Sequence, residues 1–167
     1  MVKVLVGYAS DSGTARDIAG LIGDALRATS CVVDVVDLMV ERPSPLGYDL
    51  VVVGSGIHAG SWYAAATDYL IAHKDALGEV SVALFNTCLN AARDDMQEVS
   101  LGYNASVEAI VAPVASASFA GRFVPEEVGF FKRIFLRTLQ QRPKDHVNPD
   151  AIRAWAQGLV ATVDTAS

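Results

Sequence analysis

Short apolar runs rich in β-branched residues alternate along the chain with longer segments of helical periodicity. The runs predict five strands, at 2–6, 31–36, 50–53, 80–85 and 109–115. Helices are expected at 15–26, 62–74, 91–105 and from Asn148 onward, where proline follows an N-cap residue. This alternation predicts an α/β domain with a parallel sheet, helices on both faces and the strand order 2-1-3-4-5.

The composition and charge of the 167 residues are those of a folded, acidic protein. Hydrophobic residues make up 51% and charged residues 19%, which excludes a disordered chain. The formal net charge of −6 argues against nucleic-acid binding, because that affinity comes from lysine and arginine. We expect neither a membrane span nor a signal peptide. We therefore expect one domain over residues 1–167, cytoplasmic, without a metal site and with Cys31 and Cys88 as reduced thiols.

Three loops are the candidate binding segments, because sheets of this order bind ligands beyond the carboxyl ends of their strands. The first loop carries Ser10, Ser12, Gly13 and Thr14 directly before a helix. Hydroxyl groups, a glycine and a helix N-terminus together form a cradle for a phosphate group. The alternative is an ordinary helix cap, in which Thr14 and Asp17 form a capping box.

The second loop, 54–61, combines small residues with His58 and is followed by Trp62 and Tyr63. Small residues allow a flat ring to lie against the backbone, and an aromatic side chain can stack on that ring. Alternatively, Trp62 and Tyr63 begin a helix with Ser61 as its N-cap and pack inward, and His58 is a surface histidine.

The third loop, 86–90, reads Asn-Thr-Cys-Leu-Asn at the carboxyl end of the fourth predicted strand. Its amide and hydroxyl groups can hydrogen-bond the edge of a heterocycle. Nothing in the sequence lowers the pKa of the Cys88 thiol, so we interpret it as structural. One phosphate cradle and two loops suited to a planar ring predict a mononucleotide site, and FMN is the natural occupant in this topology.

At these loops the chain resembles the flavodoxin family. That family's phosphate loop reads approximately Thr/Ser-x-Thr/Ser-Gly-x-Thr, and residues 10–15 read Ser-Asp-Ser-Gly-Thr-Ala. The sequence departs from the pattern at Ala15, where the family has threonine, and at Asp11, which places a carboxylate in the loop. The resemblance implies a flavodoxin-like three-layer α/β sandwich with a five-stranded parallel sheet and FMN as cofactor.

A closer resemblance is to the flavodoxin-like, quinone-linked protoporphyrinogen dehydrogenases of bacteria. Residues 54–63 are similar to that family's second loop, and 119–122 and 151–156 are also similar. The resemblance implies electron transfer by a flavin, with a redox partner protein or a quinone as the partner, and no catalytic side chain. The residues expected to hold the cofactor are Ser10, Asp11, Ser12, Gly13, Thr14, Ala15, Ser55, Gly56, Ile57, His58, Trp62, Asn86, Thr87, Cys88, Leu89 and Asn90.

The segment from Val124 to Leu139 carries an apolar stripe interleaved with basic residues. One interpretation is an interfacial helix that contacts a membrane, a quinone or another protein. The other is a helix packed on the core with its basic residues extending outward. The alternative for the whole chain is a flavodoxin-like interaction module that has lost its flavin, because Asp11 and Ala15 depart from the phosphate-loop pattern.

Overall fold

A parallel β-sheet forms the centre of the protein, whose computed structural model describes residues 1–123 and 144–166. Its strands are β1 (Lys3–Ala9), β2 (Val32–Asp37), β3 (Leu50–His58), β5 (Ser81–Cys88) and β6 (Ala115–Ala120), in the order β2-β1-β3-β5-β6. The predicted order 2-1-3-4-5 is confirmed. One short strand is added, because β4 (Ser61–Trp62) pairs antiparallel with the end of β3. A separate two-stranded pair consists of β7 (Arg122–Phe123) and β8 (Lys144–Asp145).

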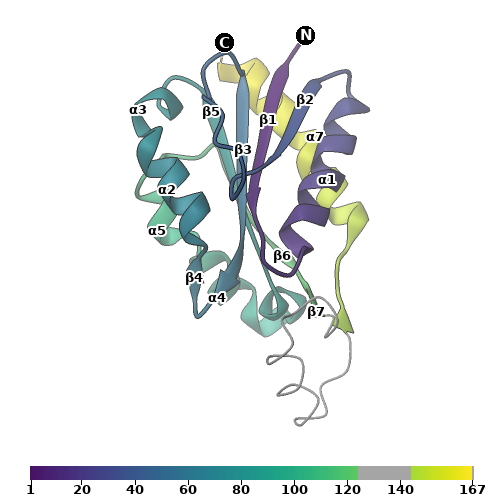
Figure 1. Cartoon of the computed structure of the whole chain (residues 1–167). Coiled ribbons are helices and arrows are strands. Elements are labelled where there is room, and N and C mark those ends of the chain that lie inside the picture. The colour runs from purple at the N-terminus through teal and green to yellow at the C-terminus, as the bar shows by residue number, and fades with distance from the viewer. Residues whose placement is uncertain (124–143, 167) are drawn as a thin grey trace.

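Helices cover both faces of the sheet, as the three-layer prediction requires (Figure 1). The helices α1 (Thr14–Arg27) and α7 (Pro149–Ala166) lie side by side on one face. The opposite face carries α2 (Ala64–Ala72), α3 (Lys74–Leu77) and α5 (Ala105–Glu108). Two short 3₁₀ helices, η1 (Leu89–Ala92) and η2 (Asp94–Met96), lead into α4 (Gln97–Gly102) near the lower end of the sheet.

Each face of the sheet buries its own apolar cluster. Successive strand side chains alternate between the faces, so Val4 and Val6 pack towards α1 while Leu5 packs towards α2. In α1, the positions Ile18, Ile22 and Leu26 recur at helical spacing and are all fully buried. Because helices cover both faces, the strands read as nearly continuous apolar runs in the sequence.

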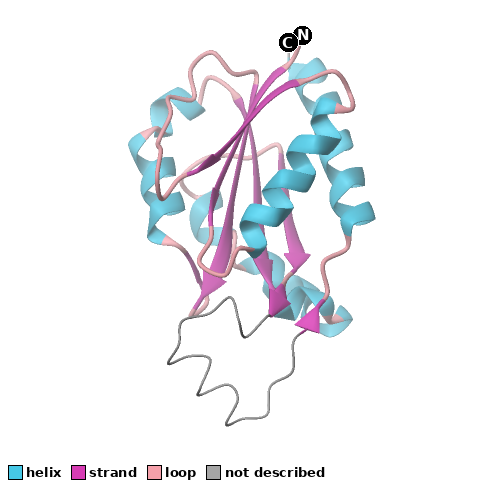
Figure 2. Cartoon of the chain, turned by 45° about the vertical axis from the view of Figure 1, so that its right-hand side comes forward, coloured by secondary structure: helices cyan, strands magenta, loops and turns pink. Residues whose placement is uncertain are grey.

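The strand register brings the carboxyl ends of the central strands to one edge. Tyr8 lies beside Gly54, Gly54 beside Phe85, and Gly56 beside Thr87. This edge lies opposite the two chain termini (Figures 1 and 2). The three loops that the sequence singled out therefore lie next to one another.

Several predicted boundaries are wrong around the second and third loops. The strands β3 and β5 continue to His58 and Cys88, so much of each predicted loop is strand. Ser61 lies in β4 and is not a helix cap, because α2 begins only at Ala64. Glycines within 54–60 suggested a loop because glycine weakens a strand pattern, but cross-strand pairing overrides that preference here.

The region after the third loop also differs from the prediction. The fifth parallel strand is 115–120 and not 109–115, where Val111 instead packs in the core beside α2. The expected helix at 91–105 is divided into η1, η2, α4 and the start of α5. The final helix is confirmed, with the Asn148 side chain accepting a hydrogen bond from the Ala151 N–H at 3.2 Å.

Two further predictions are affected by which residues are described. The segment 124–139 lies within the range 124–143, outside the described residues, so its two interpretations stay predictions. Among residues 1–123 and 144–166, no helix combines the length and apolar character that crossing a membrane requires. Cys31 and Cys88 are both free thiols.

Candidate functional site

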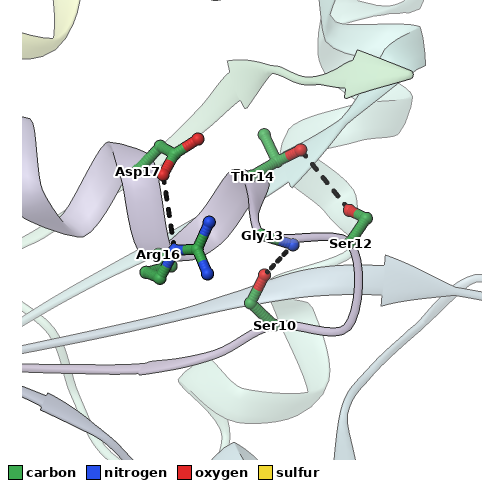
Figure 3. A network of polar contacts seen from close by, with 6 residues as sticks. All are labelled: Ser10, Ser12, Gly13, Thr14, Arg16 and Asp17. Carbon is green, nitrogen blue, oxygen red and sulfur yellow. Dashed lines mark hydrogen bonds and ion pairs between the residues drawn. The ribbon is translucent and has the colours of Figure 1, made fainter. Parts of the chain in front are cut away.

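The first loop leads directly into the start of α1 (Figure 3). Gly13 is the N-cap residue of α1, with a left-handed φ of 90°, and its N–H donates to Ser10 Oγ at 2.9 Å. The Ser12 and Thr14 hydroxyls lie 3.4 Å apart. Thr14 is thus inside the helix, and the capping box predicted for it is wrong. At the start of α1, the N–H groups of the first turn have no carbonyl within the helix to donate to, which favours an anion there.

A cation that the sequence analysis did not single out lies over this loop. A Cβ on Gly13 would come within 2.9 Å of Arg16 Nη2, so the guanidinium folds back across the glycine. Arg16 also pairs with Asp17 at 3.4 Å and keeps 60% of its side chain exposed. The sequence signal was present, because a third-position helical residue projects back over the helix start.

Asp11 and Ala15, the two departures from the family pattern, have different surroundings. Asp11 is exposed at the tip of the loop, whereas Ala15 is only 1% exposed and belongs to the packed side of α1. Burial raises the pKa of Tyr63, and the negative charge of Asp11 raises it further.

The second loop is a β-hairpin. Its turn consists of Ala59 and Gly60, both with positive φ, of 51° and 78°. This is the pattern of the tight turns that join antiparallel strands. Ile57 pairs with Trp62 across the hairpin. His58 is exposed, in agreement with its interpretation as a surface histidine.

The aromatic ring beside the small residues is that of Tyr63. A Cβ on Gly56 would come within 2.8 Å of the Tyr63 ring, which is half-buried. Ser55 fixes this arrangement, because its Oγ accepts the Tyr63 N–H at 2.9 Å and donates to the Gly56 carbonyl at 2.7 Å. Trp62 is only 7% exposed and packs in the core beside α2, so its inward-packing interpretation is the one observed.

In the third loop, the side chain of Asn86 is fully hydrogen-bonded, and that of Thr87 is not. Asn86 is fully buried and its amide bonds to the Ser100 carbonyl, Asn104 and Ser118, so it has no free N–H for the edge of a ring. The Thr87 hydroxyl is buried without a hydrogen-bond partner among the described residues. Cys88 is half-buried, and its sulfur lies 3.9 Å from Ser118 Oγ.

The structure thus brings the three loops to one edge but changes the roles of some residues. The first loop, Ser55, Gly56 and Tyr63 lie close together, whereas Trp62 and Asn86 point into the core. At the outer end of the third loop, Leu89 is 41% exposed and Asn90 is half-buried, so both can contact a ligand or solvent.

Comparisons with known proteins agree with this fold. A family model described as a flavodoxin domain matches residues 5–150. The protoporphyrinogen IX dehydrogenase (quinone) of Escherichia coli strain K12 is 25% identical over 95 residues, which are 56% of this chain and 52% of that protein. The alignment therefore spans about half the length of that curated relative.

Two solved structures share the fold. A short-chain flavodoxin associated with a bacterial microcompartment superposes with a TM-score of 0.62 at 12% identity, covering 98% of this chain and 99% of that one. A Fusobacterium nucleatum flavodoxin bound to flavin mononucleotide superposes with a TM-score of 0.50 at 15% identity, covering 71% and 69%. At these identities the likeness establishes the fold alone. Because the family match covers most of the sequence, this chain belongs to the flavodoxin domain family.

Proposed function

We propose that this protein binds FMN at the carboxyl edge of its sheet and transfers electrons. The observation that carries the proposal is the first loop, in which a left-handed glycine, hydroxyl groups and an arginine converge on the N-terminus of α1. When bound, FMN supplies the redox chemistry, and the protein supplies its position and electrostatic surroundings.

The loop fits a phosphate group through donors that do not depend on the two departures. The N–H groups of Ala15 and Arg16 belong to the first helical turn, where backbone geometry provides donors whatever the side chain. Ala15 is buried, so a threonine side chain at this position would lie on the packed side of the helix. The Arg16 guanidinium adds a positive charge beside Gly13 and can bond a phosphate in a bidentate manner.

The second loop fits a planar ring. Gly56 and Tyr63 offer a small residue and an aromatic face, and the Ser55 hydroxyl holds both in place. We propose that the ring lies between this hairpin and residues 87–90, with the phosphate end at residues 10–16. The Fusobacterium nucleatum flavodoxin with bound flavin mononucleotide, which shares the fold, supports this cofactor.

The test compares FMN with riboflavin, which lacks the phosphate. Arg16→Gln should weaken FMN binding by about fivefold, because an exposed charge pair contributes about 1 kcal/mol, and should leave riboflavin binding unchanged. Arg153→Gln is the matched control, since Arg153 also lies near the start of a helix and pairs with an acidic neighbour at 3.4 Å. Equal FMN affinities for the wild type and Arg16→Gln would contradict the assignment of the phosphate end.

The match to protoporphyrinogen IX dehydrogenase (quinone) favours a second, more specific function. We propose a quinone or a redox protein as the electron acceptor and test protoporphyrinogen as the donor. In anaerobic solution, protoporphyrinogen should bleach the flavin absorbance of the loaded protein, and a quinone should restore it. Absence of bleaching would remove this substrate and leave an electron carrier. A protein that takes up no FMN at all would favour the flavin-free interaction module.

A further inference from the structure

Two fully buried asparagines form a hydrogen-bond network directly behind the second and third loops. Asn104 Oδ1 accepts from Trp62 Nε1 and from Asn86 Nδ2, each at 2.9 Å. The Asn104 Nδ2 donates to the Ala117 carbonyl at 3.1 Å. Both asparagines are 0% exposed, so bulk water does not compete for these hydrogen bonds. The network therefore joins β4, β5, β6 and the residue before α5.

The donor of Trp62 sets the direction of every other bond in this network. An indole N–H can only donate, so it must face the oxygen of Asn104. Asn86 must then present its Nδ2 to that same oxygen, which turns its own Oδ1 towards Ser118, whose hydroxyl donates at 2.8 Å. The second Asn86 N–H goes to the Ser100 carbonyl at 2.8 Å. Each amide therefore has one orientation that satisfies its neighbours.

The network connects parts of the two loops proposed to flank the flavin ring. Trp62 pairs with Ile57 in the hairpin and directly precedes Tyr63, whose ring lies beside Gly56. Asn86 directly precedes the third-loop residue Thr87. The two hydrogen bonds to Asn104 therefore connect the hairpin and the end of β5 through one buried side chain.

We infer that Asn104 is a positioning residue for the flavin ring. It holds the hairpin and the end of β5 at the separation that the ring requires. This inference rests on the proposed function. Without the Asn104 side chain, Trp62 Nε1 and Asn86 Nδ2 lose their shared acceptor in a buried site, and each must move to find another partner. The hairpin then shifts relative to β5, and Tyr63 shifts with it.

The experiment compares Asn104→Ala and Trp62→Phe with a matched control, Tyr69→Phe. Trp62→Phe keeps an aromatic ring and removes one donor, so it also reports on the network if Asn104→Ala does not fold. Tyr69→Phe likewise removes one donor, a 2.8 Å bond to the Pro43 carbonyl, from a fully buried ring in the same core cluster. Each variant is titrated with FMN below its melting temperature, and the visible spectrum of the bound flavin is recorded.

The network variants should bind FMN about tenfold more weakly, the equivalent of one hydrogen bond, with a shifted visible band. Tyr69→Phe should lower only the melting temperature. Unchanged affinity and an unchanged band in both network variants would overturn the inference and leave a purely structural network. Failure of the wild type to bind FMN would instead overturn the proposed function, and the inference with it.

Discussion

Replacing Gly54 by alanine tests how closely the sheet is packed at the candidate site. Gly54 lies opposite Phe85 in the β3–β5 pair, and a Cβ at position 54 would lie 2.0 Å from Cζ of that ring and 2.1 Å from its Cε1. Carbon atoms in contact are about 3.5–4.0 Å apart. The ring or the strand must therefore move by about 1.5 Å to accept one methyl group.

The Phe85 ring has little room for that movement. It is fully buried, and its centroid lies 6.1 Å from that of Phe119 and 6.4 Å from that of Trp155. Overpacking of this kind costs about 1–3 kcal/mol. Alanine also restricts the unfolded chain, which returns about 0.4–1 kcal/mol. We expect Gly54→Ala to lower the free energy of unfolding by about 1–2 kcal/mol.

Urea unfolding of a double-mutant cycle provides the assay. In a Phe85→Leu background the ring atoms that clash are absent, so Gly54→Ala should cost at least about 1 kcal/mol less than in the wild type. Gly20→Ala is the control, because nothing lies within 4 Å of its added Cβ, and it should raise stability by up to about 1 kcal/mol. Effects of Gly54→Ala and Phe85→Leu that add to within about 0.5 kcal/mol would refute the packing argument.

Three further predictions concern other parts of the fold. Gly13→Ala should lower the unfolding free energy by about 1–2 kcal/mol through its positive φ, and unchanged urea midpoints would contradict this. The hydrogen bond to Asp34 raises the pKa of Tyr48 from 10.0 to about 12. The stability that this hydrogen bond gives the folded protein is therefore complete below pH 10 and is lost as the pH rises through 12. Tyr48→Phe should therefore lose less stability than the wild type between those pH values, and equal losses would refute the assignment. Asn148→Ala should cost about 1 kcal/mol through loss of the α7 cap, measured as a lower thermal midpoint, and an unchanged midpoint would refute the capping role.

The topology could be predicted because periodicity is a local property of the sequence. The runs at 2–6 and 50–53 are almost entirely apolar, as is typical of strands covered on both faces, and α1 repeats its apolar positions every three or four residues. The strand at 115–120 differs from the predicted one because its first four side chains, alternating alanine and serine, are small and only half-buried. The apolar residues just before it follow the end of α5 in a turn and connecting segment, and a short apolar run of this kind cannot be told from a strand by periodicity alone.

The sequence predicts that the site lies at the carboxyl ends of the strands, but not which side chains face it. Which aromatic side chain stays partly exposed depends on the hairpin, which buries Trp62 and leaves Tyr63 half-buried, and on Asn104, which lies 42 residues from Trp62 in the chain. Asn86 carries a polar group at a strand end, as binding residues do, but distant partners satisfy it. Long-range hydrogen bonds of this kind leave no local pattern in the sequence.

Titration of the purified, flavin-free protein with FMN, followed by the change in flavin fluorescence, is the direct test of a flavin site at the carboxyl edge. We expect saturation at one FMN per chain and weaker binding of riboflavin, because the first loop holds the phosphate. A fluorescence signal that stays unchanged, together with no flavin retained after gel filtration, would contradict the assignment of the carboxyl edge as a flavin site.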